Sequence, residues 1–190
     1  MDALAGPAGV AAAILIVAGG VKLKKPLPVT GSLALLKLPR SIALVRVLGA
    51  CEIAVGTAAL IGEPRVSYAA LAGAYTVFAV FTTWALIQDK PLASCGCFGD
   101  PDTPATPTHV VLTAIAAATA AAAAASGSPA LRTILTAEGW RVIPLAIFLG
   151  LGIYLAFLAF TALPRAIMPA RVGRTQTTWF EASMTSGGNR

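Results

Sequence analysis

Five long apolar segments limit what this chain can fold into more than any other feature. The hydrocarbon layer of a bilayer is about 30 Å thick, so a helix needs about 20 mostly apolar residues to cross it. Hydrophobic residues make up 57% of the 190 residues and the mean hydropathy is +0.79, which is typical of membrane proteins and not of soluble domains. The sequence therefore predicts an all-α membrane protein with spans near residues 3–21, 42–61, 67–87, 109–125 and 142–163.

The order of these segments predicts three regions. Residues 1–125 are expected to form a four-helix transmembrane bundle, with a short interfacial helix near 31–40 where leucines alternate with basic residues. Residues 126–164 are expected to hold a connection and a fifth transmembrane helix, and residues 165–190 a basic tail. The first segment begins with Asp2 in place of a basic region, so we expect it to be a retained helix and not a cleaved signal peptide.

The net charge of +6 does not indicate nucleic-acid binding. The basic residues lie between the apolar segments and after the last one, and no basic face interleaved with aromatic residues is present in the sequence. We interpret them as topology signals and as contacts to lipid headgroups.

One acidic residue, Glu52, falls in the middle of an apolar segment. An unpaired carboxylate inside a membrane costs several kcal/mol. Helical spacing puts it on one stripe with Gly49, Gly56 and Ala59, a face suited to close packing against another helix. We therefore expect Glu52 to point into the bundle, either to fix helix packing or to relay protons.

The charge partner of Glu52 is not fixed by the sequence. Arg46 lies six residues earlier, about 120° around the helix, a spacing that does not favour a direct pair. Lys22 or a residue of another helix is the alternative. The neighbouring Cys51 is expected to be a small core residue.

Reactive and flexible residues concentrate between Ser94 and Asp100. This stretch contains two of the three cysteines, Cys95 and Cys97, separated by Gly96. Glycine permits the tight backbone of a very small disulfide ring, and strain in such a ring raises its reduction potential. The pattern predicts thiol–disulfide redox chemistry at this pair.

Two other interpretations of the same stretch stay open. The two cysteines can form a disulfide that only staples the loop. They can also combine with His109 and with Asp100 or Asp102 as metal ligands, although structural zinc sites favour wider cysteine spacing and four clear ligands. We expect no metal site.

His109, the single histidine, opens the next apolar segment. An imidazole there can lower a thiol pKa or hydrogen-bond an electron acceptor, or it can be an ordinary interfacial polar group. The prolines up to Pro107 predict that Thr108 caps this helix. The candidate catalytic residues are Cys95, Cys97, Glu52 and His109.

Three motifs together resemble one known family. They are Gly19-Gly20-Val21-Lys22-Leu23, then Leu38-Pro39 followed by Leu48-Gly49-Ala50-Cys51-Glu52-Ile53-Ala54-Val55-Gly56, and Cys95-Gly96-Cys97-Phe98-Gly99. Over about residues 8–125 the chain resembles the MauE and DoxX-like integral membrane proteins. The cysteine motif after a third span is the most specific of the three.

The resemblance implies a four-helix bundle of the DoxX-like type that takes part in thiol–disulfide chemistry. It also implies a thioredoxin-like partner, because relatives act beside such domains or are fused to them. This sequence ends in a basic tail instead, so we expect that partner to be a separate protein.

Two functions of different classes follow. In the first, Cys95 and Cys97 exchange a disulfide with the thioredoxin-like partner, and electrons pass to or from a quinone near His109. In the second, the chain is a structural accessory subunit of a larger respiratory or other membrane complex. There Phe157 and the tail around Trp179 provide contact surfaces, and the cysteines are a staple.

The side of the membrane that carries the cysteines is left open by two opposing arguments. With five spans, the cysteine loop shares its face with ten Lys and Arg residues, against three on the other face, which favours the cytoplasm. Stable disulfides, in contrast, belong outside the reducing cytosol. Basic residues on an interfacial helix or in a tail have less influence on topology than those in short loops. We therefore favour an extracytoplasmic cysteine loop in a cell-membrane protein.

Overall fold

The structure is a computed structural model that describes residues 4–35, 37, 39–87, 106–137 and 142–162. Within these ranges the chain is helical and contains no strand. The helices are α1 (Ala5–Lys24), α2 (Leu27–Leu35), α3 (Ile42–Ile61), α4 (Pro64–Ile87), α5 (Pro107–Ser126), α6 (Leu131–Ala137) and α7 (Val142–Thr161).

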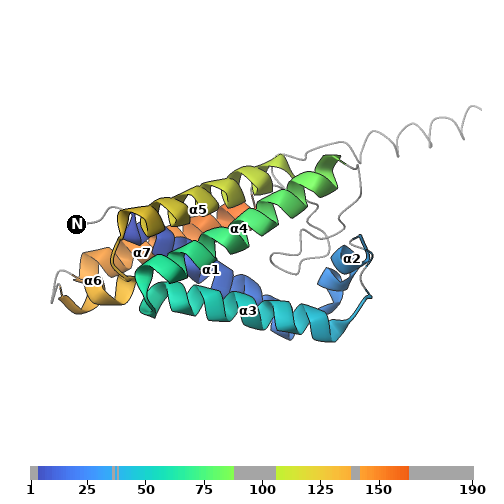
Figure 1. Cartoon of the computed structure of the whole chain (residues 1–190), viewed down its shortest axis with the longest axis horizontal. Helices are drawn as coiled ribbons and strands as arrows, with labels where there is room; N and C mark the ends of the chain where they lie inside the picture. Colours follow the sequence, from blue (N-terminus) through green and yellow to red (C-terminus); the bar gives the residue numbers. More distant parts are fainter. Residues whose placement is uncertain (1–3, 36, 38, 88–105, 138–141, 163–190) are drawn as a thin grey trace, which may run out of the picture.

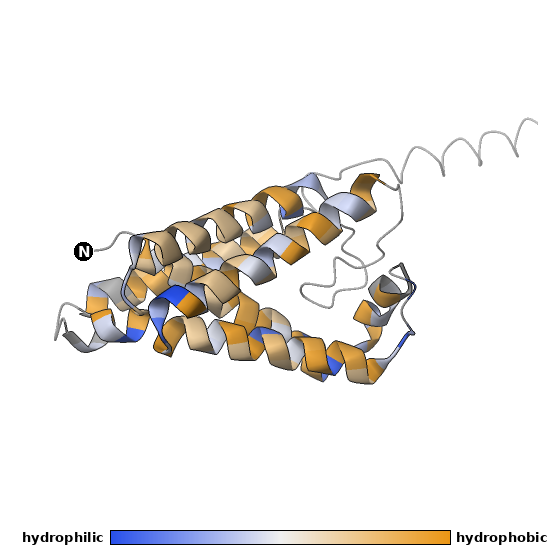
Figure 2. Cartoon of the chain, in the orientation of Figure 1, coloured by the Kyte–Doolittle hydropathy of each residue, from blue (hydrophilic) through white to orange (hydrophobic). Residues whose placement is uncertain are grey.

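Four of these helices, α1, α3, α4 and α5, are long and apolar enough to cross a membrane. The hydropathy colours of Figure 2 are mostly hydrophobic along them, and the strongly hydrophilic positions lie mainly near their ends. The predicted all-α, multi-pass membrane protein is thereby confirmed. In α7 the apolar stretch is the shorter Ala146–Phe160, so the fifth span stays a prediction.

The short helix α2 occupies Leu27–Leu35, whereas the sequence led us to expect an interfacial helix near 31–40. Pro28 explains the earlier start, because proline is tolerated in the first turn of a helix, where its missing N–H has no partner to lose. Figure 1 shows α2 beside the beginning of α3, at one end of the bundle.

The helix α1 is the centre of the bundle. It packs along α3 and also contacts α5 and α7, while α4 packs along α5 (Figure 1). Consecutive long helices run in opposite directions, so one end of the bundle gathers the end of α1, the start of α3, the end of α4 and the start of α5. We call this end the polar end, for the residues described below.

Alanines and tyrosines fill the middle of the bundle. Ala120 and Ala123 of the alanine-rich α5 are fully buried, which agrees with the use of small side chains for close helix contacts. The buried Tyr75 hydroxyl donates to the carbonyl of Ala11 at 2.7 Å, and the Tyr68 hydroxyl donates to the carbonyl of Pro129 at 3.0 Å. Both tyrosines therefore tie distant segments together without leaving an unpaired hydroxyl.

Glycines bring α1 and α3 into backbone contact. A methyl group added at Gly49 would lie 2.8 Å from the carbonyl oxygen of Gly19, and one added at Gly19 would lie 2.5 Å from that of Gly49. Gly56 meets the carbonyl of Ala12 in the same way, at 2.8 Å. The neighbouring Gly20 has nothing within 4 Å, so of the Gly19-Gly20 pair Gly19 makes the close approach.

We predict that Gly49→Ala lowers the free energy of unfolding by about 1–3 kcal/mol, because backbone atoms cannot yield to the added methyl as a flexible side chain can. The measurement is thermal unfolding in detergent followed by circular dichroism. Gly20→Ala is the matched control, with open space around it, and should leave the midpoint unchanged or slightly raised. Equal midpoints for the two variants would contradict the close contact.

Candidate functional site

A buried ion pair joins the two central helices at the polar end. The Lys22 ammonium of α1 lies 2.7 Å from Oε2 of Glu52 on α3, and the side chains are only 2% and 3% exposed. The stripe predicted around Glu52 is confirmed, because Gly49, Gly56 and Ala59 are buried with it. Of the partners left open by the sequence, the structure has Lys22, while Arg46 is exposed on α3.

Helix geometry explains why these two charges meet. A side chain on a helix leans towards that helix's N-terminus, and α1 and α3 run in opposite directions, so Lys22 and Glu52 lean towards each other. Each lies three residues after a glycine of the close contact. Gly19 faces Cβ of Glu52 and Gly49 faces Cβ of Lys22, both at 3.1 Å from an added methyl. The glycines therefore make the room in which the pair forms.

The pair keeps unused hydrogen-bonding capacity. Among the described residues, Oε1 of Glu52 is buried without a hydrogen-bond partner. The Lys22 ammonium has three donors; one is directed to Glu52, and the ammonium also lies 5.6 Å from the ring centre of Phe78. A polar group that reached this place would find donors and an acceptor already desolvated.

His109 is buried, 1% exposed, in the first turn of α5. The backbone N–H of Thr106 donates to Nδ1 at 3.3 Å, and the Thr106 hydroxyl lies 2.9 Å from the same nitrogen. This geometry assigns the proton of a neutral ring to Nε2. The imidazole also hydrogen-bonds the backbone of Phe160, whose ring centre is 6.2 Å away. His109 thus fixes the start of α5 against the end of α7.

The predicted cap of α5 is wrong by two residues. Thr106 is the N-cap and Pro107 occupies the first helical position, where we had expected Thr108 to cap. Proline suits that position because its fixed φ already matches a helix and the N–H that it lacks would have no partner. The helix consequently includes His109 in its first turn, and the imidazole reaches back to the cap residue.

His109 and the ion pair lie at the same end of the bundle. The Thr113 hydroxyl donates to the carbonyl of His109 at 2.7 Å, one turn along α5. Thr113, Lys22 and Phe160 in turn line one small space. The structure therefore brings Lys22 and Glu52 to within a few side chains of His109.

The predicted reactive pair, Cys95 and Cys97, lies outside the described residues, and so do Asp100 and Asp102. What the structure describes is the two helices on either side: α4 ends at Ile87, and Thr106 caps α5. Over the described parts of the chain, no group of three His, Cys, Asp or Glu side chains gathers as metal ligands. The redox, staple and metal interpretations of the cysteines therefore stay predictions from the sequence.

Cys51, expected in the core, is instead exposed on α3. Its neighbour Glu52 takes the inward position, and adjacent residues on a helix are about 100° apart. Sequence reasoning also left out Thr106 and Thr113, and it gave Lys22 only as one alternative. The signal for Lys22 was the shared spacing of a glycine three residues before each charge.

The comparisons with known proteins identify a family. A family model described as methylamine utilisation protein MauE matches residues 3–127. The searches of curated proteins and of solved structures gave no match. The matched residues cover α1 to α5, which include the ion pair and His109.

We predict that Lys22→Met or Glu52→Leu alone lowers the free energy of unfolding by about 3 kcal/mol or more, because each leaves one buried charge unpaired. The double variant should recover most of the loss. Thermal unfolding in detergent measures all three, with Lys24→Met, an exposed lysine on the same helix, as the control. Single variants as stable as the control would contradict a stabilising pair.

Proposed function

The chain belongs to the MauE family, and on this premise we propose that it is a membrane protein of thiol–disulfide redox chemistry. In this proposal Cys95 and Cys97 exchange a disulfide with a separate thioredoxin-like protein. A thiolate of one protein attacks the disulfide of the other, a mixed disulfide forms, and the second cysteine releases it. Two electrons and two protons move between the proteins in each exchange.

The observation that carries the proposal is where the segment containing the cysteines is attached. It connects Ile87 of α4 to Thr106, and both lie at the polar end. The α5 side is held by the contacts of His109 with Thr106 and Phe160. A reactive pair performs best when rigid elements support it, and a buried ion pair within the same end supplies such support.

We assign Glu52 and His109 to positioning in this scheme. Glu52 is engaged by Lys22 between two helices, and His109 is engaged by Thr106 at a helix start, which are contacts that hold an architecture. Oε1 of Glu52, which has no hydrogen-bond partner among the described residues, leaves a second use as a proton acceptor. Both residues would then affect thiol exchange through the support of the Cys95–Cys97 segment.

The family and the fold together also support a proposal for the physiological role and the membrane topology of this chain. The family description supports a role in methylamine utilisation, in which this chain would be accessory to the proteins that handle the amine. We also propose that α7 is a fifth span beside a DoxX-like bundle. We place the cysteines on the extracytoplasmic side of the cell membrane in this proposal, because disulfides are stable outside the reducing cytosol.

We predict that replacing both Cys95 and Cys97 by serine abolishes disulfide exchange with a reduced thioredoxin-like substrate. Cys51→Ser is the matched control, since Cys51 lies on the outer face of α3, and it should exchange at the unchanged rate. Trapping mixed disulfides with a single-cysteine partner and resolving them on non-reducing gels measures the reaction. Unchanged exchange in the double variant would remove the redox proposal.

A second candidate, a structural accessory subunit of a larger membrane complex, is favoured by one observation. The helix α7 exposes aromatic side chains, with Phe148 at 73% and Tyr154 at 58%, which a neighbouring subunit could cover as well as lipid. Extraction in a mild detergent separates the two candidates. Stoichiometric recovery with a large complex supports the subunit, and a free protein with a titratable cysteine pair supports the redox protein.

A further inference from the structure

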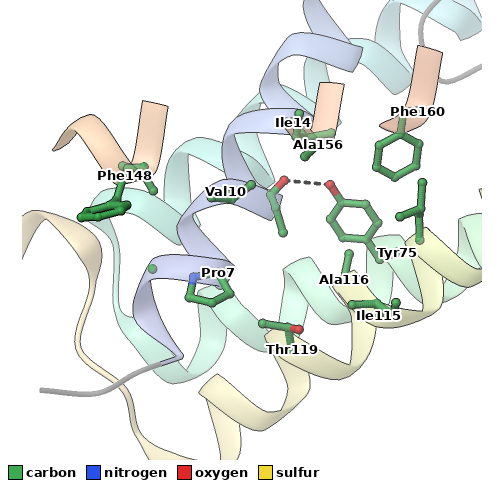
Figure 3. A pocket seen from close by; sticks show the side chains of 14 residues that line it. Pro7, Val10, Ile14, Tyr75, Ile115, Ala116, Thr119, Phe148, Ala156 and Phe160 are labelled. Atoms are coloured by element: carbon green, nitrogen blue, oxygen red, sulfur yellow. Dashed lines mark hydrogen bonds between the residues drawn. The ribbon is translucent and has the colours of Figure 1, made fainter. Parts of the chain in front are cut away.

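An apolar cavity of about 450 Å³ lies between α1, α5 and α7 (Figure 3). None of the fourteen described residues that line it is charged. Tyr75 of α4 lines it too, but its hydroxyl already donates to the carbonyl of Ala11, as the dashed line in Figure 3 marks. Thr119 of α5 carries the other side-chain hydroxyl of the lining. The lining therefore favours an apolar ligand.

The cavity can be reached from the side of the bundle. Ile115 of α5 and Phe148 of α7 line it and are themselves exposed on the outer surface. Ile14 and Tyr75 line it as well and are buried. Because α1, α4 and α5 are long and apolar enough to cross a membrane, the exposed side of the cavity would face the hydrocarbon of the bilayer. A ligand would therefore enter from the lipid.

The dimensions of the cavity match one aliphatic chain. At about 1.5 Å per residue, its lining extends over about 12 Å of α1, from Gly6 to Ile14, and about 18 Å of α7, from Phe148 to Phe160. The hydrocarbon of one leaflet is about 15 Å deep, half of the full layer. A helix with its side chains is about 10 Å wide, so two turns of one would need about twice the volume. The cavity thus has the length of an acyl chain and is too small for a helix of another protein.

We propose that this cavity binds one acyl chain of a membrane phospholipid, which inserts between α5 and α7 and packs against Ile14 of α1. The chain has no polar atom that needs a partner, and the headgroup stays at the membrane surface. A quinone ring at the same place would bury two carbonyl oxygens beside the hydroxyls of Tyr75 and Thr119, of which the first is already engaged. The lining therefore suits the acyl chain better.

The bound chain would connect α7 to the rest of the bundle. The family match ends at residue 127, so α1, α4 and α5 lie in the matched part and α7 lies beyond it. Ala116 of α5 lines the cavity together with Ala156 and Phe160 of α7. An acyl chain between these helices would add dispersion contacts to both. The proposal does not depend on the proposed thiol–disulfide function.

Photo-crosslinking of the full-length protein in phosphatidylcholine vesicles tests the proposal. A small share of the lipid carries a diazirine along its acyl chain, and adducts are assigned to residues by mass spectrometry. We expect adducts at Ile14 and Tyr75, which are buried and line the cavity, but not at Val45 and Leu71, which are buried and do not line it. Val77, exposed on α4, should be labelled as a contact of the surrounding lipid. Adducts confined to exposed residues would overturn the proposal.

A pair of variants on α7 locates the site. Ala156→Phe fills part of the cavity and should lower the adducts at Ile14 about tenfold, whereas Ala146→Phe, at an exposed position of the same helix, should change them less than about twofold. Unchanged labelling of Ile14 in Ala156→Phe would overturn the location. The labelling pattern of the unaltered protein tests the proposal without any variant.

Competition separates an acyl chain from a quinone. Unlabelled phosphatidylcholine and decylubiquinone are added to the vesicles at the same mole fraction, and the adducts at Ile14 are compared. We expect decylubiquinone to lower the labelling no more than the phospholipid does, because the cavity offers its carbonyl oxygens little compensation. A decrease about tenfold larger with decylubiquinone would show selection of the quinone ring and would overturn the assignment to a phospholipid.

Discussion

The ion pair between Lys22 and Glu52 is the interaction on which the polar end depends. Neither charge is tolerable alone among apolar helices, and together they are neutral and hydrogen-bonded at 2.7 Å. The pair forms only because Gly19 and Gly49 let the backbones of α1 and α3 touch. Charges and glycines thus form one unit: a larger residue at either glycine would separate the helices and with them the two charges.

This unit gives the bundle two unlike ends. The opposite end contains α6 and the turn between α3 and α4. In that turn the Glu63 carboxylate accepts a hydrogen bond from the backbone N–H of Val66 at 2.8 Å. At the polar end lie the buried charges, His109 and Thr113, and Oε1 of Glu52 has no hydrogen-bond partner among the described residues. A reaction that needs desolvated polar groups would therefore take place at the polar end, where the segment with the cysteines is also attached.

Sequence reasoning succeeded where a residue type has a single physical use. A carboxylate in an apolar helix must face inward, so the position of Glu52 followed from its spacing with glycines. It failed where the pattern carries no such constraint. In a membrane helix both faces are apolar, so the position of Cys51 on the outer face became clear only when the neighbours of α3 were known. The cap of α5 lies two residues before the predicted Thr108, because proline, which breaks a helix in its interior, is favoured at the first helical position.

The sequence by itself determined that the chain is a helical membrane protein, because apolar segments of this length have only one way to satisfy their backbone hydrogen bonds in lipid. It also determined that Glu52 needs a partner and that the cysteines are the most reactive groups. Only the tertiary structure decided that Lys22 is that partner, that His109 joins α5 to α7, and that a cavity lies between α1, α5 and α7. These depend on which helices lie side by side and in which rotation, and local sequence alone does not fix a contact between residues 30 positions apart, such as Lys22 and Glu52.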